Sequence, residues 1–244
     1  MKQDDGLLLS GSLYLRNRRQ ENSVLMPIGN VTDLKFETKT ETKKRESRQK
    51  NQLGQVLDSV TMSQGTEVSW VFDTFNRENL SFALSGEVIE LPNKVATETD
   101  VVYTIPKRGL PIQLNHEDID AATLKVQTED GEAIDFECNA LLGLLTVHDD
   151  AIEDGDNIKV SYTTRARSGY EIRASTISDF DFELKLDGYN HASGKDCVLH
   201  CESVKVAADG AIEWLKGDFA STSAKGDVVT VNGNKHAYTF REYD

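Results

Sequence analysis

Residues 31–51, VTDLKFETKTETKKRESRQKN, decide how the rest of this chain is interpreted. Val31, Leu34 and Phe36 begin an extended segment with charged residues on its opposite face. Residues 39–51 then contain no large apolar residue at all. A polar segment of this length between two strands cannot offset its own ordering entropy. We therefore expect a long charged loop that is mobile in a single copy and becomes ordered only against a partner.

The sequence after this segment predicts two more strands and a short helix. Apolar residues mark extended segments at 57–62 and 67–72. Asn76 is placed to cap a helix over residues 77–85, and Gly86 is placed to end it. The order from residue 31 is therefore strand, charged loop, strand, strand and helix.

Three further segments carry strand signals. Residues 6–16 are predicted as an N-terminal strand, and residues 180–187 alternate apolar and charged side chains, which is typical of a half-buried strand. Near the C-terminus, Asn232-Gly233-Asn234 separates two apolar runs, at 228–231 and 236–240. An Asn-Gly pair between such runs predicts a β-hairpin.

Charge is distributed unevenly along the 244 residues. The net charge is −14, and residues 97–160 hold 15 acidic and 4 basic residues, or −11 of that total. The same block has its own series of predicted strands: 101–105, 110–114, 123–128, 133–137, 144–147 and 158–163. Gly-containing turns are predicted at 107–109, 129–131 and 153–156. A shift in composition that coincides with a complete set of strands predicts an inserted domain at 96–164.

The composition also limits function. Sequence-independent binding to free nucleic acid needs Lys and Arg to displace phosphate counterions, so a net charge of −14 argues against it. An acidic surface fits one that DNA passes without sticking, and it equally fits ordinary solubility. The chain shows neither a signal peptide nor an apolar stretch of transmembrane length, so we expect a soluble protein made in a reducing cytoplasm, without membrane contact.

The sequence offers little for catalysis or metal binding. Its cysteines, Cys138, Cys197 and Cys201, do not suggest a disulfide framework, and the last two are better explained as buried small apolar residues of a strand. The acidic turn at 153–156 lacks the ligand spacing of a calcium loop. No nucleophile elbow, phosphate loop or zinc-helix motif is present, so we expect no enzyme activity, no cofactor and no metal.

The order of elements resembles the tail tube (major tail) proteins of long-tailed bacteriophages. The segments that carry the resemblance are 29–34, 41–46, 54–60, the Trp70 strand leading to 79–86, 180–190 and 217–219. The resemblance implies a mainly β fold: a tail-tube β-sandwich or barrel with one short flanking α-helix. This domain would be built from 1–95 and 165–244. The block at 96–164 is similar to the small immunoglobulin-like modules embedded in virion proteins, and we expect it to face outwards.

The resemblance also implies partners and location. Tail tube subunits form hexameric rings that stack into a tube conducting DNA during infection. The implied partner is therefore the chain itself, together with tape-measure and tail terminator or distal tail proteins. DNA would pass through without specific binding, in a virion tail that is assembled in the host cytoplasm.

Two groups of residues are candidate sites. The first is a basic group placed to contact the next ring: Lys39, Lys43, Lys44, Arg45, Arg48 and Lys50. Opposite charges across such a contact would set register and partner choice. A solvated hairpin tip is the alternative. The second is the polar side of the strand at 180–187, with Asp181, Glu183 and Asp187 as candidate lumen-facing carboxylates that repel phosphate. The alternative is a face that looks outwards or meets a neighbouring subunit.

A different class of function also fits a chain of two β domains. An adhesion or carbohydrate-binding module of a virion or cell surface would show similar strand patterns and a similar acidic composition. Rings or tubes in electron micrographs would favour the first interpretation. Monodisperse monomers that bind glycans would favour the second.

Overall fold

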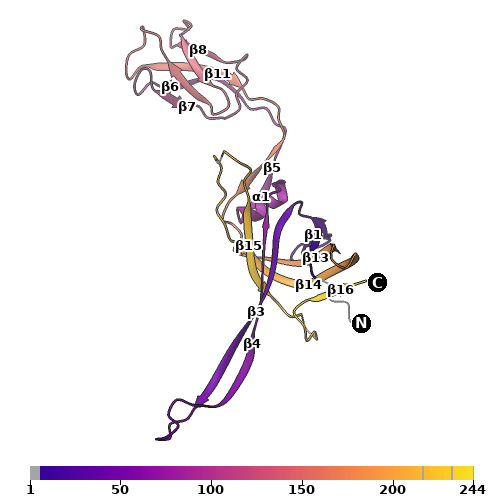
Figure 1. The fold of residues 1–244 in the computed structure, drawn as a ribbon. Helices are drawn as coiled ribbons and strands as arrows, with labels where there is room; N and C mark the ends of the chain where they lie inside the picture. The colour runs from indigo at the N-terminus through magenta and orange to yellow at the C-terminus, as the bar shows by residue number, and fades with distance from the viewer. Residues whose placement is uncertain (1–5, 216, 232, 244) are drawn as a thin grey trace. The chain divides into compact units, whose positions relative to one another are not determined.

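The alternating segment near residue 180 becomes the centre of the main sheet. The computed structural model describes residues 6–215, 217–231 and 233–243 (Figure 1). Within it, β13 (Phe180–Asn190) pairs antiparallel with β1 (Leu9–Asn17) on one side and β14 (Lys195–Ala208) on the other. The protein is mainly β, with 52% strand, one short helix, a main antiparallel sheet and small separate sheets.

Eight strands form the main sheet, in the order β2-β1-β13-β14-β15-β4-β3, with β16 paired to β14. Its other strands are β2 (Met26–Pro27), β3 (Val31–Glu46), β4 (Val56–Phe72), β15 (Thr222–Val228) and β16 (Thr239–Glu242). The alternation predicted for the N-terminal strand is confirmed, because Leu13 and Leu15 are both buried in β1.

Aromatic side chains fill the core of this sheet, and helix α1 (Arg77–Ala83) packs on them. Phe82 of the helix contacts Phe180 edge-on, with ring centroids 4.9 Å apart. The predicted cap is present: the Asn76 side chain accepts a hydrogen bond from Asn79 N at 2.8 Å. The Asn79 side chain in turn donates to the Ile28 carbonyl at 2.7 Å, which ties the helix start to the chain after β2.

The helix ends differently from the prediction. It stops at Ala83, and the residue in the left-handed region is Ser85, at φ +50°, rather than Gly86. Gly86 is needed for a different reason. A Cβ at this position would lie 2.7 Å from the carbonyl oxygen of Arg173, so only glycine allows the two backbone segments to approach this closely.

The predicted C-terminal hairpin is wrong. β15 ends at Val228 and pairs with β14 and β4, whereas β16 begins at Thr239 and pairs with β14. Asn232, in the predicted turn, lies outside the described residues. The apolar runs therefore flank an irregular segment, and each finds its partner in a longer strand that is already part of the sheet.

Two compact units make up the chain: the main unit, with the described residues up to Ile89 and from Ile172 onwards, and the inserted unit, residues 90–171. The limits expected from sequence, 96–164, lie inside this second unit. The chain passes between the units through β5 (Glu87–Leu91) and β12 (Gly169–Arg173), which pair as a two-stranded ribbon.

The inserted unit is a small β-sandwich. One sheet has the order β7-β10-β9 and the other β6-β11-β8. Their bounds are β6 (Thr97–Thr104), β7 (Pro111–Gln113), β8 (Lys125–Thr128), β9 (Phe136–Asn139), β10 (Leu144–Val147) and β11 (Asn157–Thr163). Ile119, Leu145 and Ile158 are fully buried in the one core that the two sheets share. All six predicted strands are present, although the fourth, expected at 133–137, forms at β9.

Candidate functional site

Most of the charged segment at 39–51 is strand rather than loop. Residues up to Glu46 belong to β3, which pairs with β4 from Val31↔Phe72 to Glu46↔Val56 and forms one long hairpin (Figure 1). Of the six candidate contact residues, four lie on β3: Lys39, Lys43, Lys44 and Arg45. Arg48 and Lys50 lie in the connection between the strands. The expectation of one long loop is therefore wrong for residues 39–46, whereas its mobility in a single copy stays a prediction.

The two strands contribute different features to the pairing. β3 alternates threonine with charged residues, and threonine has high β-propensity. β4 supplies valine or methionine opposite three of the charged residues, in the pairs Glu41↔Met62, Lys43↔Val60 and Glu46↔Val56. Cross-strand contacts add to this, with the Thr42 and Thr61 hydroxyls 2.9 Å apart and Gln64 donating to the Glu41 carboxylate at 2.6 Å. The absence of large apolar residues on one strand did not prevent pairing.

The connection at the hairpin end is itself ordered by hydrogen bonds. Ser47 is buried, its N–H donates to the Gln55 carbonyl at 2.8 Å, and its own carbonyl accepts from Gly54 at 2.9 Å. The Ser47 hydroxyl accepts from Gln49 N at 3.2 Å. Arg48 and Lys50, carried by this compact turn, are both exposed.

The two faces of the hairpin differ in chemistry. Directly opposed residues of antiparallel strands point to the same face. One face, here called the apolar-basic face, carries the pairs Lys43↔Val60, Glu41↔Met62 and Arg45↔Asp58. The other, the hydroxyl face, carries Lys44↔Ser59, Thr42↔Thr61 and Thr40↔Ser63. The three adjacent basic residues at 43–45 are thus divided between two faces.

The hairpin beyond the main sheet buries almost nothing. β15 covers β4 only from Glu67 to Phe72, so residues 56–66 of β4 pair with β3 alone. Val60 is 56% exposed and Leu57 is 50% exposed. A two-stranded hairpin with no covered face is marginally stable in water. Its exposed apolar side chains are therefore an unused contact surface.

A charge cluster anchors the hairpin where it leaves the sheet. Glu67 of β4 forms ion pairs with Lys39 of β3 and with Lys225 of β15, the latter at 3.4 Å. The hydrogen bond from Lys39 is the main cause that lowers the pKa of Glu67, and the same bond raises the pKa of Lys39. Lys39 thus has an intramolecular partner, and the remaining candidate cations lie further out.

Both ends of the main sheet leave backbone groups available. β3 is the terminal strand on one side, and among the described residues no strand pairs with its outer edge. On the other side β1 pairs with β2 only at Tyr14↔Pro27 and Leu15↔Met26, and no strand of the described residues pairs with that edge of Leu9–Ser12. Open edges of this kind form hydrogen bonds with strands of another chain.

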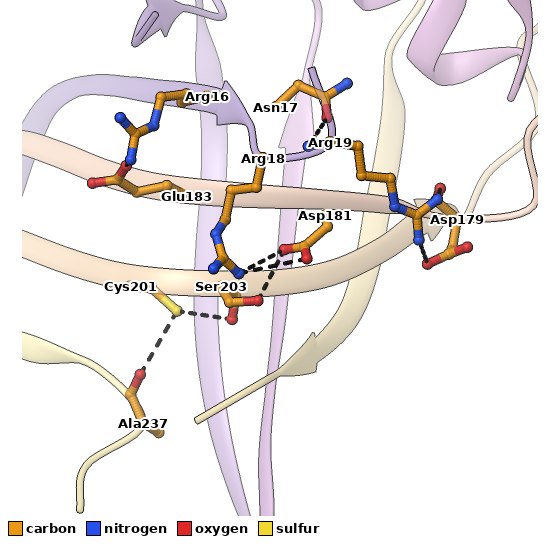
Figure 2. Close-up of polar contacts among 10 residues, drawn as sticks. All are labelled: Arg16, Asn17, Arg18, Arg19, Asp179, Asp181, Glu183, Cys201, Ser203 and Ala237. Atoms are coloured by element: carbon orange, nitrogen blue, oxygen red, sulfur yellow. Dashed lines mark hydrogen bonds and ion pairs between the residues drawn. The ribbon is translucent and has the colours of Figure 1, made fainter. Parts of the chain in front are cut away.

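The second candidate group lies on β13, where the structure pairs two of the three carboxylates with arginines (Figure 2). Asp181 accepts from Arg18 Nη1 at 3.2 Å and from the Ser203 hydroxyl at 2.9 Å. An irregularity in the β13–β14 register, between Phe182 and Leu184, lies beside this contact. Asp181 is therefore a partly buried, satisfied group.

Glu183 is held more tightly. It is only 6% exposed, forms an ion pair with Arg16 across the β1–β13 pairing, and lies 2.9 Å from His200 Nε2 and 3.4 Å from Lys185 Nζ. Burial alone would raise the pKa of Glu183. The hydrogen bond with His200 and the charges of Arg16 and Lys185 outweigh burial and lower this pKa below its ordinary value of 4.5.

Asp187 differs from both, because it is exposed and lies on the same alternating face of β13. Of the three candidate carboxylates, only this one presents a free surface to solvent in a single copy. Which strands would line a lumen stays a prediction. The electrostatic argument for the other two changes, however, since arginines neutralise them.

Sequence reasoning missed these arginines, which it assigned to an unremarkable polar segment at 16–22. Arg19 completes the series, with Nη1 donating to the Asp179 carbonyl at 2.9 Å. A signal was present: the basic residues at 16 and 18 have the same spacing of two as the acidic residues at 183 and 181. Antiparallel pairing of β1 with β13 brings them into register, with Arg16 opposite Glu183.

The cysteines behave as predicted for buried apolar residues. Cys197 and Cys201 are 1% and 0% exposed, and burial raises the pKa of Cys201 to about 11. In the described part of the chain, no group of three or more His, Cys, Asp or Glu side chains is arranged to hold a metal ion. The one described helix is too short to cross a membrane.

Comparison with known proteins places the chain by sequence. No curated protein matches it. A family described as "Protein of unknown function UCP028589" matches residues 7–239, which include both units and nearly the whole chain. The chain therefore belongs to this family.

Proposed function

We propose that this protein is a structural subunit that assembles with copies of itself into stacked rings, forming the tail tube of a long-tailed bacteriophage. The observation that carries the proposal is the β3–β4 hairpin. It extends well past the sheet that anchors it and exposes apolar side chains on a surface that no described residue covers. Such a patch on a soluble protein marks an interaction site.

In this proposal the hairpin connects one ring to the next. Val60 and Met62 supply apolar area, and Lys43 and Arg45 on the same face supply charge that sets register against an acidic neighbour. Contact with another copy would cover the face that leaves the lone hairpin marginal. The basic hairpin and the acidic remainder of the chain have the opposite charges that such stacking requires.

Ring closure would use the two open edges of the main sheet. The outer edge of β3 and the Leu9–Ser12 part of β1 lie at opposite ends of the strand order. A contact between two different surfaces is head-to-tail, and it closes into a ring when its rotation permits. Six copies are the number that the resemblance to tail tube proteins implies. Paired edges would also remove an aggregation hazard.

DNA would pass through such a tube without a binding site. The net charge of −14 disfavours tight phosphate binding. If β13 faces the lumen, Asp187 presents an unpaired carboxylate there. Asp181 and Glu183, paired with Arg18 and Arg16, present little net charge. A wall of this kind would repel phosphate groups weakly and would offer DNA no binding site.

The proposal is tested by shortening the hairpin in the full chain. Replacing residues 40–63 with Asn-Gly keeps the Lys39–Glu67 anchor and removes the exposed part. We expect the wild-type protein to sediment as large assemblies, and the shortened protein to keep its circular dichroism spectrum but stop at single rings or smaller species. Equal sedimentation of both proteins as long assemblies would contradict the role of the hairpin.

A further inference from the structure

The main unit contains an open apolar cleft between α1 and the main sheet, with a volume of about 590 Å³. Its walls are built by Leu15, Ile28, Trp70, Phe72, Phe82 and Phe180. Polar side chains such as Gln20, Ser23 and Glu87 surround the opening. An apolar centre with a polar rim is the anatomy of a protein interface.

Trp70 adds a polar feature to the cleft wall. The residue is 1% exposed, and its indole Nε1 has no hydrogen-bond partner among the described residues. A buried donor left without an acceptor costs stability. The cleft wall is therefore apolar at Trp70 and includes a buried donor that no described residue satisfies, and the cleft itself is unfilled by the described residues of its own chain.

The same unit also exposes a group of large apolar side chains, next to Ile212, which itself packs against the core. Between β14 and β15, three large side chains are exposed: Trp214 by 66%, Leu215 by 100% and Phe219 by 92%. We call the described residues of 209–221 the aromatic loop. None of them lines the cleft of its own chain. Three such side chains within six positions mark an interaction site rather than scattered surface residues.

We infer that the aromatic loop of one copy binds in the cleft of the next copy. Two other exposed segments fit less well. Leu7 and Leu8 are exposed, but Leu8 is fixed to its own sheet by hydrogen bonds with Asn190 and His191. The hairpin end offers one large exposed apolar side chain, Leu53, whereas the aromatic loop offers three.

The loop and the cleft are different surfaces, so this contact is head-to-tail and rests on the proposed assembly into rings. Large aromatic side chains bury about 150–250 Å² each. The loop and the cleft together would therefore bury roughly 1,000 Å², less than the approximately 1,600 Å² of a standard stable interface. The contact is one part of the ring interface, and sheet-edge pairing supplies the rest.

Two variants of the full chain test the inference by complementation. The loop variant is W214S/L215S/F219S. The cleft variant is V24R/M26R, at two cleft-lining positions that are 62% and 58% exposed and so tolerate arginine without disturbing the core. Circular dichroism checks that both fold. Each variant alone should need at least a tenfold higher concentration than wild type to assemble.

Mixing the two variants gives the decisive result. The intact loop of the cleft variant can bind the intact cleft of the loop variant. The altered loop and the altered cleft that remain cannot bind a third copy. The mixture should therefore sediment as dimers, whereas each variant alone stays monomeric at the same concentration. Absence of dimers in the mixture would overturn the inference, as would a loop variant that assembles like the wild type.

Acrylamide quenching gives an independent measurement on the wild type. The chain has two tryptophans, and because Trp70 is buried the quenchable emission comes from Trp214. Quenching should fall on assembly, and unchanged quenching would overturn the inference. If the wild type forms tubes and the loop variant forms them equally well, only this inference is rejected. Wild-type oligomers that need the loop but form no tubes reject only the proposed function. A wild type that stays monomeric rejects both.

Discussion

Lys43 on β3 lies directly opposite Val60 on β4, so the two side chains leave the hairpin on the same face. This pairing joins a cation to an exposed apolar residue on the apolar-basic face. The hydroxyl face, by contrast, is held together by contacts such as that between Thr42 and Thr61. If the hairpin connects rings, the two faces need not contribute equally, and substitutions can separate them.

Charge placed on the apolar-basic face should block ring stacking. We expect V60D/M62D to lose long assemblies, because the apolar area of the proposed contact is replaced by two carboxylates, and the one at 60 would neutralise Lys43 opposite it. The matched control is T61D/S63D, which adds the same charge to the same strand on the hydroxyl face. Sedimentation velocity compares them. Equal losses in both variants would show that total charge, rather than the apolar-basic face, controls stacking.

Reversing basic residues separates the contributions within 43–45. The double variant K43E/R45E changes the apolar-basic face, and K44E changes the hydroxyl face. All three side chains are exposed, so the fold should be retained in each variant. We expect the double variant to reduce tube growth at least tenfold and K44E to change it little. Normal polymerisation by the double variant would show that Lys43 and Arg45 do not contribute to the contact between rings.

The Glu183 cluster predicts a specific dependence of stability on pH. The folded pKa of this carboxyl is lowered below 4.5, so its stabilising contribution is present above that pH and is lost as pH falls through the folded pKa. E183Q should therefore cost about 1–3 kcal/mol at pH 7, since buried partners lose a charged acceptor. As pH falls below the folded pKa of Glu183, the wild type and the variant should converge. Urea unfolding across this range measures the difference, and a constant gap down to the lowest pH would contradict the assignment.

The inserted unit should be dispensable for assembly. Its core is separate from that of the main unit, and its ends lie close together, with Ala96 N donating to Thr164 Oγ1 at 2.8 Å. Deleting 96–164 with a short Gly/Ser bridge keeps the β5–β12 ribbon. We expect a folded protein that still forms tubes. An unfolded spectrum would show that the main unit depends on the insertion.

A single added cation on β13 tests the lumen hypothesis with little damage to the fold. Asp187 is exposed, so D187K should assemble normally. D181K and E183K would break ion pairs, so a loss of infectivity in them could come from an unstable fold. If Asp187 faces the lumen, the added lysine binds phosphate and slows DNA delivery. Virions carrying D187K that infect at wild-type efficiency would argue against that position.

The sequence predicted features that depend on local pattern. The alternation at β13 and the buried pair Leu13 and Leu15 follow from a period of two, and the Asn76 cap follows from a side chain that reaches its own helix. The six short strands of the inserted unit were also found by pattern, because turns containing glycine separate several of them.

The failures all involve partners that are distant in sequence. Residues 39–46 lack apolar side chains, and their strand character depends on what β4 places opposite them. β16 pairs with β14, a strand of 14 residues, rather than with β15, which has 7. Gly86 is required because the carbonyl of Arg173, 87 residues later in the chain, lies too close for a Cβ. The partners of the arginines at 16–19 can be identified only once β1 is paired with β13. Local propensity holds no information on such pairings.

The most direct measurement of the central claim is negative-stain electron microscopy of the purified full chain over a range of concentrations. We predict rings with a central hole at low concentration, and hollow tubes of stacked rings as concentration rises. Monodisperse particles at every concentration would contradict the claim, and glycan binding by those particles would point to an adhesion module instead.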